Sequence, residues 1–113
     1  MATVIPFEEM RSSPTASLFE GDKHGEGVPI SSFIVATHPG RGPSLHTHPY
    51  AEVFVVLEGQ ATFTSGDEEV TVAGGNVVVV PPEAPHKFVN SGSGTLRMVN
   101  IHPNGTVVQT DLE

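Results

Sequence analysis

Turn-forming residues interrupt this sequence so often that only short secondary-structure elements fit between them. Twelve glycines and ten prolines are spread over 113 residues. From Ser31 onward they alternate with short runs rich in Val, Ile, Thr and Phe. Turns at intervals of about 8 to 12 residues are typical of a β-sandwich or β-barrel, and Gly and Pro destabilise the interior of a helix. We therefore predict one all-β domain, because a chain of this length usually forms a single core.

The predicted strands are apolar and β-branched runs bounded by turn residues. We expect strands over residues 30–37, 45–48, 52–57, 60–65, 69–73, 77–80, 86–90, 95–102 and 107–112. Residues 1–28 contain few apolar runs, so we predict an N-terminal arm in which residues 8–11 are the candidate for a helical turn. The β-domain is then expected over residues 29–113.

Composition argues against several classes of protein. The absence of cysteine excludes a disulfide framework, a thiolate metal site and a cysteine nucleophile. Five basic and thirteen acidic residues give a net charge of −8, which repels phosphate backbones and anionic lipid headgroups. The first ten residues lack the basic region and apolar run of a signal peptide, and no run approaches a membrane-spanning length. We expect a cytoplasmic protein that binds neither nucleic acid nor membranes.

Three of the six histidines and one glutamate stand out by their spacing. His46 and His48 lie two positions apart in a predicted strand, so both side chains leave the same face, with Cα atoms roughly 6.5 Å apart. Glu52 has the same parity beyond Pro49, and His86 follows a proline-rich connector. Three imidazoles and one carboxylate suit a first-row divalent metal ion, with coordination positions left open as in catalytic sites.

These residues lie within two motifs that resemble those of the cupin superfamily. The first comprises Gly40, five residues, His46-Thr47-His48, three residues, Glu52, six residues and Gly59. The second comprises Gly75, five residues, Pro81-Pro82-Glu83-Ala84-Pro85-His86, three residues and Asn90. One position departs from the pattern, because Glu83 stands where the second motif usually has glycine.

The resemblance implies a small antiparallel jelly-roll β-barrel, also called a double-stranded β-helix. It also implies one divalent transition metal ion, Mn, Fe, Ni, Cu or Zn, held by His46, His48, Glu52 and His86. Cupins commonly form dimers, and the apolar stretches 3–7 and 16–19 of the arm could add a strand to a neighbour's sheet edge. We therefore predict a homodimer.

Further side chains are candidates for contact with a small-molecule substrate. Four phenylalanines either line an apolar cavity or simply fill the barrel, which is the interpretation we favour: Phe33, Phe54, Phe63 and Phe88. Asn100 and His102 share one face of the last long predicted strand and either face the pocket or point into solvent. Solvent is the simpler interpretation for His102, which precedes Pro103 at a strand end. Tyr50 needs no role at what we expect to be an exposed turn.

The resemblance does not name a reaction, because metal-retaining cupins host dioxygenases, oxidases, decarboxylases and isomerases. Few acid–base side chains besides the ligands are expected inside the barrel, which leaves the chemistry to the metal. Our leading hypothesis is an oxidoreductase of the dioxygenase type acting on a small carbonyl or phenolic compound, with Glu52 as ligand or, if displaced, as catalytic base. The alternatives are a metal-bearing domain that binds or senses a small molecule without turnover, and a metal-dependent lyase or isomerase.

Overall fold

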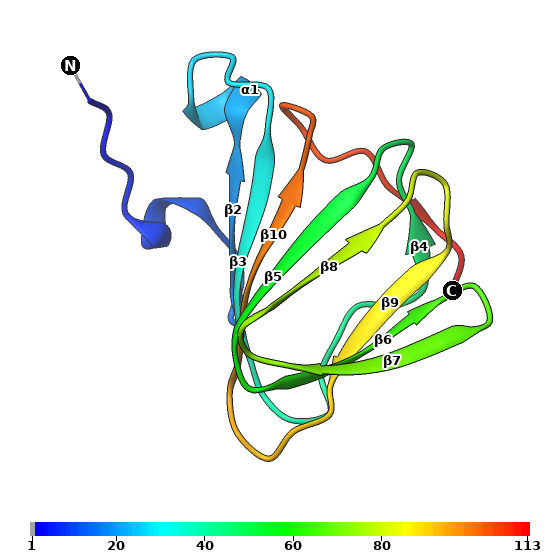
Figure 1. The fold of residues 1–113 in the computed structure, drawn as a ribbon. Helices are drawn as coiled ribbons and strands as arrows, with labels where there is room; N and C mark the ends of the chain where they lie inside the picture. The colour runs from blue at the N-terminus through cyan, green and yellow to red at the C-terminus, as the bar shows by residue number, and fades with distance from the viewer. Residues whose placement is uncertain (1) are drawn as a thin grey trace.

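The computed structural model describes residues 2–113, which form two antiparallel β-sheets facing each other (Figure 1). The larger sheet has the order β1 (Arg11–Ser13), β2 (Ala16–Glu20), β3 (Ser31–Thr37), β10 (Leu96–His102), β5 (Glu52–Glu58), β8 (Asn76–Val80). The smaller sheet has the order β11 (Thr110–Asp111), β4 (His46–Thr47), β9 (His86–Asn90), β6 (Gln60–Ser65), β7 (Glu68–Ala73). This confirms the predicted all-β jelly-roll barrel. Among residues 2–113, no helix is long and apolar enough to cross a membrane.

The N-terminal segment is more structured than the sequence pattern indicates. It begins with a single 3-10 turn, η1 (Phe7–Met10), close to the predicted helical turn, and ends with the short helix α1 (Gly21–His24). Between them, β2 pairs with β3 from Ala16 opposite Val35 to Glu20 opposite Ser31. Residues 16–19 thus pair with β3 of their own chain. They occupy the edge of β3 to which the strand of a dimer partner was expected to add. The hydroxyl of the buried Ser17 donates a hydrogen bond to the carbonyl of Phe7, which ties the turn to this strand.

Two predicted strands are much shorter in the structure. Residues 45–48 contribute only β4, and residues 107–112 contribute only β11, which pairs Thr110 with Thr47 and Asp111 with His46. Residues 103–109 instead run without regular structure between β10 and β11. The β-branched residues in that stretch predicted a strand, but the backbone groups of Val107 and Val108 bond instead to the side chains of Glu20, Tyr50 and His48.

The inward-facing side chains change from apolar at one end of the barrel to polar at the other. Strand β10 pairs with both β3 and β5, and one of its faces points into the barrel. Its alternate residues are therefore buried, from Leu96 and Met98 to Asn100 and His102. The apolar core consists of Val35, Phe54, Val56, Ala61, Phe63, Val80, Phe88, Leu96 and Met98. Toward the opposite end, the buried side chains of β4, β5, β9 and β10 are His46, Glu52, His86 and His102. The polar end is therefore built on the same strands as the core.

The turn at Glu83 explains why glycine is usual in the corresponding motif. Glu83 has a φ of 65°, in the left-handed region that side chains disfavour. Its N–H donates a hydrogen bond of 2.8 Å to the carbonyl of His48, so the turn is held against the residue that directly follows β4. The side chain of Glu83 itself is exposed.

We predict that Glu83→Gly stabilises the protein. Left-handed backbone costs a residue with a side chain about 1–2 kcal/mol, and the greater flexibility of glycine in the unfolded chain offsets about 0.5–1 kcal/mol of that gain. We therefore expect the free energy of unfolding in urea to rise by about 0.5–1 kcal/mol. Glu83→Ala is the control, because it removes the carboxylate and keeps the strain. Equal stability of the two variants would contradict this explanation.

Candidate metal centre

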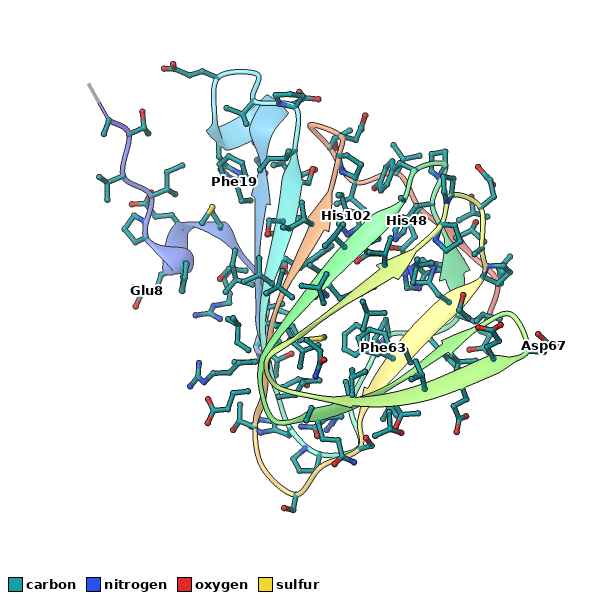
Figure 2. All side chains as sticks on the ribbon, viewed as in Figure 1. Glu8, Phe19, His48, Phe63, Asp67 and His102 are labelled. Carbon is teal, nitrogen blue, oxygen red and sulfur yellow. The ribbon has the colours of Figure 1, made fainter. Side chains whose placement is uncertain are left out.

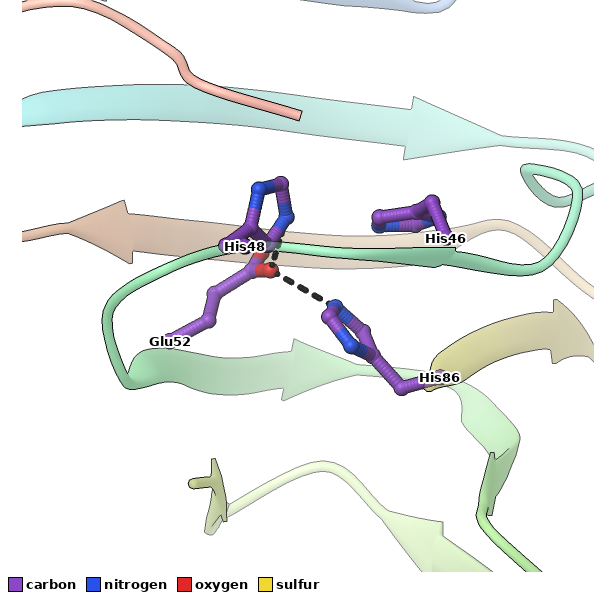
Figure 3. Close-up of side chains that lie close together, drawn as sticks. All are labelled: His46, His48, Glu52 and His86. Carbon is purple, nitrogen blue, oxygen red and sulfur yellow. Dashed lines mark hydrogen bonds and ion pairs between the residues drawn. The ribbon is translucent and has the colours of Figure 1, made fainter. Parts of the chain in front are cut away.

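Four ligand-type side chains from both sheets converge at the polar end of the barrel (Figure 3). His46 lies in β4 with its Cα opposite that of His86 in β9, His48 follows β4 directly, and Glu52 begins β5. All four are nearly inaccessible to solvent, with exposures of 2% to 6%. Their nearest ligand atoms all lie within 4.8 Å of one another. The structure thus brings together the four residues that the sequence motifs single out.

Hydrogen bonds fix which nitrogen each of the three histidines presents to this cluster. In each ring, Nδ1 contacts a main-chain carbonyl: Ser44 for His46 (2.7 Å), Val108 for His48 (2.7 Å) and Ala84 for His86 (2.9 Å). A carbonyl only accepts hydrogen bonds, so Nδ1 carries the proton in all three rings. A neutral ring then has its lone pair on Nε2, which is the arrangement of histidines that bind metal ions.

The contacts around Glu52 call for a positive charge between the ligand atoms. Oε1 of Glu52 lies 3.0 Å from Nε2 of both His48 and His86. Within the described part of the chain, the buried Nε2 of His48 has no hydrogen-bond partner of suitable geometry. Lone pairs on nitrogen and carboxylate oxygen repel at this distance unless a proton or a metal ion lies between them. Two ligands bound at about 2.1 Å and at right angles on one ion are about 3.0 Å apart, so the arrangement fits a divalent metal ion.

Electrostatics within the cluster also suit a cation. Burial by itself raises the pKa of Glu52, but its close contacts with His102, His48 and His86 outweigh burial and hold the pKa well below its usual range. Glu52 is therefore ionised at neutral pH. Burial lowers the pKa of His46, which keeps this ring neutral. For His48, burial is outweighed by its contacts with Glu52 and the Val108 carbonyl, which raise its pKa.

A cavity of about 540 Å³ adjoins the cluster, and residues from both sheets line it. Its apolar lining includes Phe33, Val35, Phe54 and Phe88, and His46, His48 and Glu52 line it as well. Residues 13–16, in the segment predicted to be an arm, form part of the wall, as does the exposed Arg41. The sequence did not identify residues 13–16 or Arg41 as part of the site, because they lie in no motif and in no run of alternating apolar and polar residues.

The structure separates the predicted substrate-binding residues into two groups. Phe33, Phe54, Phe88, Asn100 and His102 line the cavity. Phe63 instead packs edge-on against Phe54 in the core, with ring centroids 4.9 Å apart.

The solvent-facing interpretation of the strand β10 residues is wrong. His102 is 1% exposed and Asn100 is 4% exposed, because this face of β10 points into the barrel, where both residues line the cavity. Tyr50 is half-buried as well, and its hydroxyl lies 2.7 Å from Nδ1 of His102. Figure 2 shows His102 and His48 near each other at this end of the barrel. The buried Oδ1 of Asn100 has no hydrogen-bond partner among residues 2–113.

We predict that the purified chain binds about one divalent transition metal ion and that His46→Ala combined with His86→Ala abolishes binding, because two of the imidazole ligands are lost. Plasma mass spectrometry after reconstitution and desalting measures the stoichiometry. His24→Ala is the matched control, since His24 lies outside the cavity and bonds to the N–H of Glu20. Equal metal content in the double variant and the wild type would contradict the site.

Comparison with known proteins agrees with this geometry. A family model described as "Cupin domain" matches residues 33–102. An uncharacterized protein of Methanocaldococcus jannaschii is 34% identical over 75 residues, which cover 66% of this chain and 60% of that protein.

The fold also matches solved structures. A variant of Bacillus subtilis oxalate decarboxylase superposes with a TM-score of 0.80 at 22% identity, over 94% of this chain and 31% of that chain. Another structure of that enzyme, described as having Mn(II) centres, gives a TM-score of 0.76 at 23% identity, over 89% of this chain and 29% of that chain. This chain therefore spans about a third of the length of that enzyme. Because the family match covers more than half of its residues and the His/Glu cluster supports one divalent metal ion, the chain belongs to the cupin family.

Proposed function

We propose that this cupin is a metal-dependent oxidoreductase of the dioxygenase type that acts on a small, partly apolar carbonyl or phenolic compound. The observation that supports this most is the apolar cavity beside the cluster of three histidines and one glutamate. A divalent ion held by His46, His48, Glu52 and His86 would supply Lewis acidity and redox capacity at the edge of this cavity. A dioxygenase places both atoms of O₂ in the substrate, which supplies the electrons, so no second cofactor is required.

The lining residues suggest how such a substrate is held. Phe33, Phe54 and Phe88 offer an apolar surface that binds the body of the substrate and excludes water. The unpartnered Oδ1 of Asn100 can accept a hydrogen bond from a substrate hydroxyl. Glu52 acts as a ligand in this proposal, because the lowered pKa that keeps it ionised also makes it a weak base.

A lyase acting on a carboxylate is a second candidate. The similar solved structures include oxalate decarboxylases. Among the described residues, Glu52 is the one carboxylate that lines the cavity, and the positively charged Arg41 lines it as well. This charge distribution favours an anionic substrate. The apolar lining, however, favours a larger molecule than a two-carbon acid, which is why we rank the lyase second.

We predict oxygen uptake with at least one combination of metal and substrate. The protein is loaded with Fe, Mn, Ni or Cu and assayed with flavonols, catechols and β-diketones in an oxygen electrode. Under ¹⁸O₂, the product should gain two labelled atoms, and His86→Ala should lower the rate by more than about 100-fold because a ligand is lost. His24→Ala should leave the rate unchanged.

The alternatives predict different outcomes. Product formation under strict anaerobiosis would replace the dioxygenase with a lyase or isomerase. Tight ligand binding by calorimetry with no product by mass spectrometry would favour a binding or sensing domain. Absence of oxygen uptake in every combination would contradict the leading proposal.

We also propose that the chain forms a homodimer. The outer face of the larger sheet is apolar at its edge, where Leu57, Val77 and Val79 are 58%, 60% and 62% exposed. Val53 and Val55 of β5 lie opposite Val79 and Val77 of the edge strand β8. Exposed apolar edges of this kind are usually covered. The cytoplasmic location and the lack of nucleic acid or membrane partners stay predictions from composition.

We predict that Val79→Lys produces monomers, because the charge would be buried at the interface between two copies. Light scattering at micromolar concentration measures the mass. Thr71→Lys on the exposed strand β7 of the other sheet is the control and should leave a dimer. A monomeric wild-type protein would contradict the proposal.

A further inference from the structure

The two carboxylate oxygens of Glu52 have different neighbours. Oε1 faces the ligand nitrogens of His48 and His86, each at 3.0 Å. Oε2 lies 3.1 Å from Nε2 of His102, a residue outside the four-residue cluster. The contact follows from the sheet register, because Ile101 of β10 is opposite Val53 of β5, which places the next pair, His102 and Glu52, side by side. Oε2 therefore faces a different strand from Oε1.

His102 presents the opposite tautomer to the three clustered histidines. A carboxylate only accepts hydrogen bonds, so Nε2 of His102 must carry a proton to interact favourably with Oε2. In the neutral ring, Nδ1 then accepts a hydrogen bond from the Tyr50 hydroxyl, 2.7 Å away. The Tyr50 oxygen in turn accepts a bond of 3.1 Å from the N–H of Val108. Among residues 2–113, Nε2 of His102 has no hydrogen-bond partner of ideal geometry, so its contact with Oε2 at 3.1 Å is mainly electrostatic. A protonated Nε2 has no lone pair for a metal ion.

The Val108 peptide links this chain of contacts to a metal ligand. Its carbonyl accepts the 2.7 Å bond from Nδ1 of His48, while its N–H donates to Tyr50. The Tyr50 ring also stacks on the His48 ring, with centroids 5.2 Å apart and an interplanar angle of 5°. Residues 103–109, which lack regular structure, therefore orient both His48 and the Tyr50–His102 pair.

We propose that His102 and Tyr50 are positioning residues that hold Oε2 of Glu52 away from the metal, so that only Oε1 binds it. This inference rests on the metal site proposed above. A carboxylate that binds through both oxygens occupies an additional coordination position. Restricting Glu52 to one oxygen keeps that position open for substrate on a six-coordinate ion, and it fixes the ligand before the ion arrives. Partners of this kind contribute about 10-fold to 100-fold to metal affinity.

Metal affinity is the first test, and it requires no turnover. Competition with a chromophoric chelator for Zn²⁺ and Mn²⁺ should show about a 10-fold to 100-fold loss in His102→Leu and a smaller loss in Tyr50→Phe. His102→Gln should recover most of the affinity, because its amide N–H can donate to Oε2. Met98→Ala is the control: Met98 is buried on the same face of β10, so the variant lowers the melting temperature but should leave the affinity unchanged.

The tautomers provide a readout that a merely structural role would not alter. Imidazole ¹⁵N spectra of the Zn²⁺-loaded protein should show Nδ1–H for His46, His48 and His86 and Nε2–H for His102. In Tyr50→Phe, Nδ1 of His102 should lose the signature of an accepted hydrogen bond. Nδ1–H at His102, or unchanged zinc affinity in His102→Leu, would overturn the positioning role alone. A wild-type protein that takes up no metal would overturn the metal site as well, and neither readout depends on oxygen chemistry.

Discussion

The burial of one ionised carboxylate among histidine rings is the constraint on which the polar end of this barrel depends. An isolated charge in a protein interior is strongly destabilising, so Glu52 requires partners on every side. Those partners come from separate places in the chain: His48 after β4, His86 in β9 and His102 in β10. The two sheets are thus joined at this end by polar contacts, while the apolar side chains of the core join them at the other.

Strands β5 and β10 each extend from the apolar core to the candidate metal site. Along β5, the inward-facing residues are Glu52, Phe54 and Val56, which belong in turn to the cluster, the cavity wall and the core. Along β10, Met98 belongs to the core, Asn100 lines the cavity and His102 contacts Glu52. Because β5 and β10 are neighbours, a shift of one residue in their pairing would reverse which faces are buried. The placement of the site residues therefore depends on the register of these two strands.

The sequence predicted the part of the site that is encoded locally. His46 and His48 share a strand face by parity, and the spacing to Glu52 and His86 completed a recognisable motif. The burial of His102 was not predictable in the same way, because it depends on tertiary contacts with Glu52 and Tyr50 inside the barrel. The position of His102 at a strand end beside Pro103 gives no sign of those contacts. The contact between Tyr50 and Val108 spans 58 residues and involves a backbone N–H, which no side-chain pattern encodes.

The same distinction applies to the fold. The turns and the alternation of β5, β6 and β9 indicated their bounds closely. Strand β2 was not predicted, because it lies in a segment with little alternation and Ser17 is the one buried residue of the strand. Its pairing with β3 supplies part of the cavity wall, so the pocket could not be drawn from the motifs alone.

X-ray absorption spectroscopy at the metal edge would show whether three imidazole Nε2 atoms and one carboxylate oxygen bind one ion. We expect a shell of nitrogen and oxygen ligands at roughly 2.0–2.2 Å together with outer-shell scattering from three imidazole rings. In His86→Ala, the outer-shell scattering should fall by the contribution of one ring. A spectrum without imidazole scattering, or one unchanged in that variant, would contradict a site of three histidines and one glutamate.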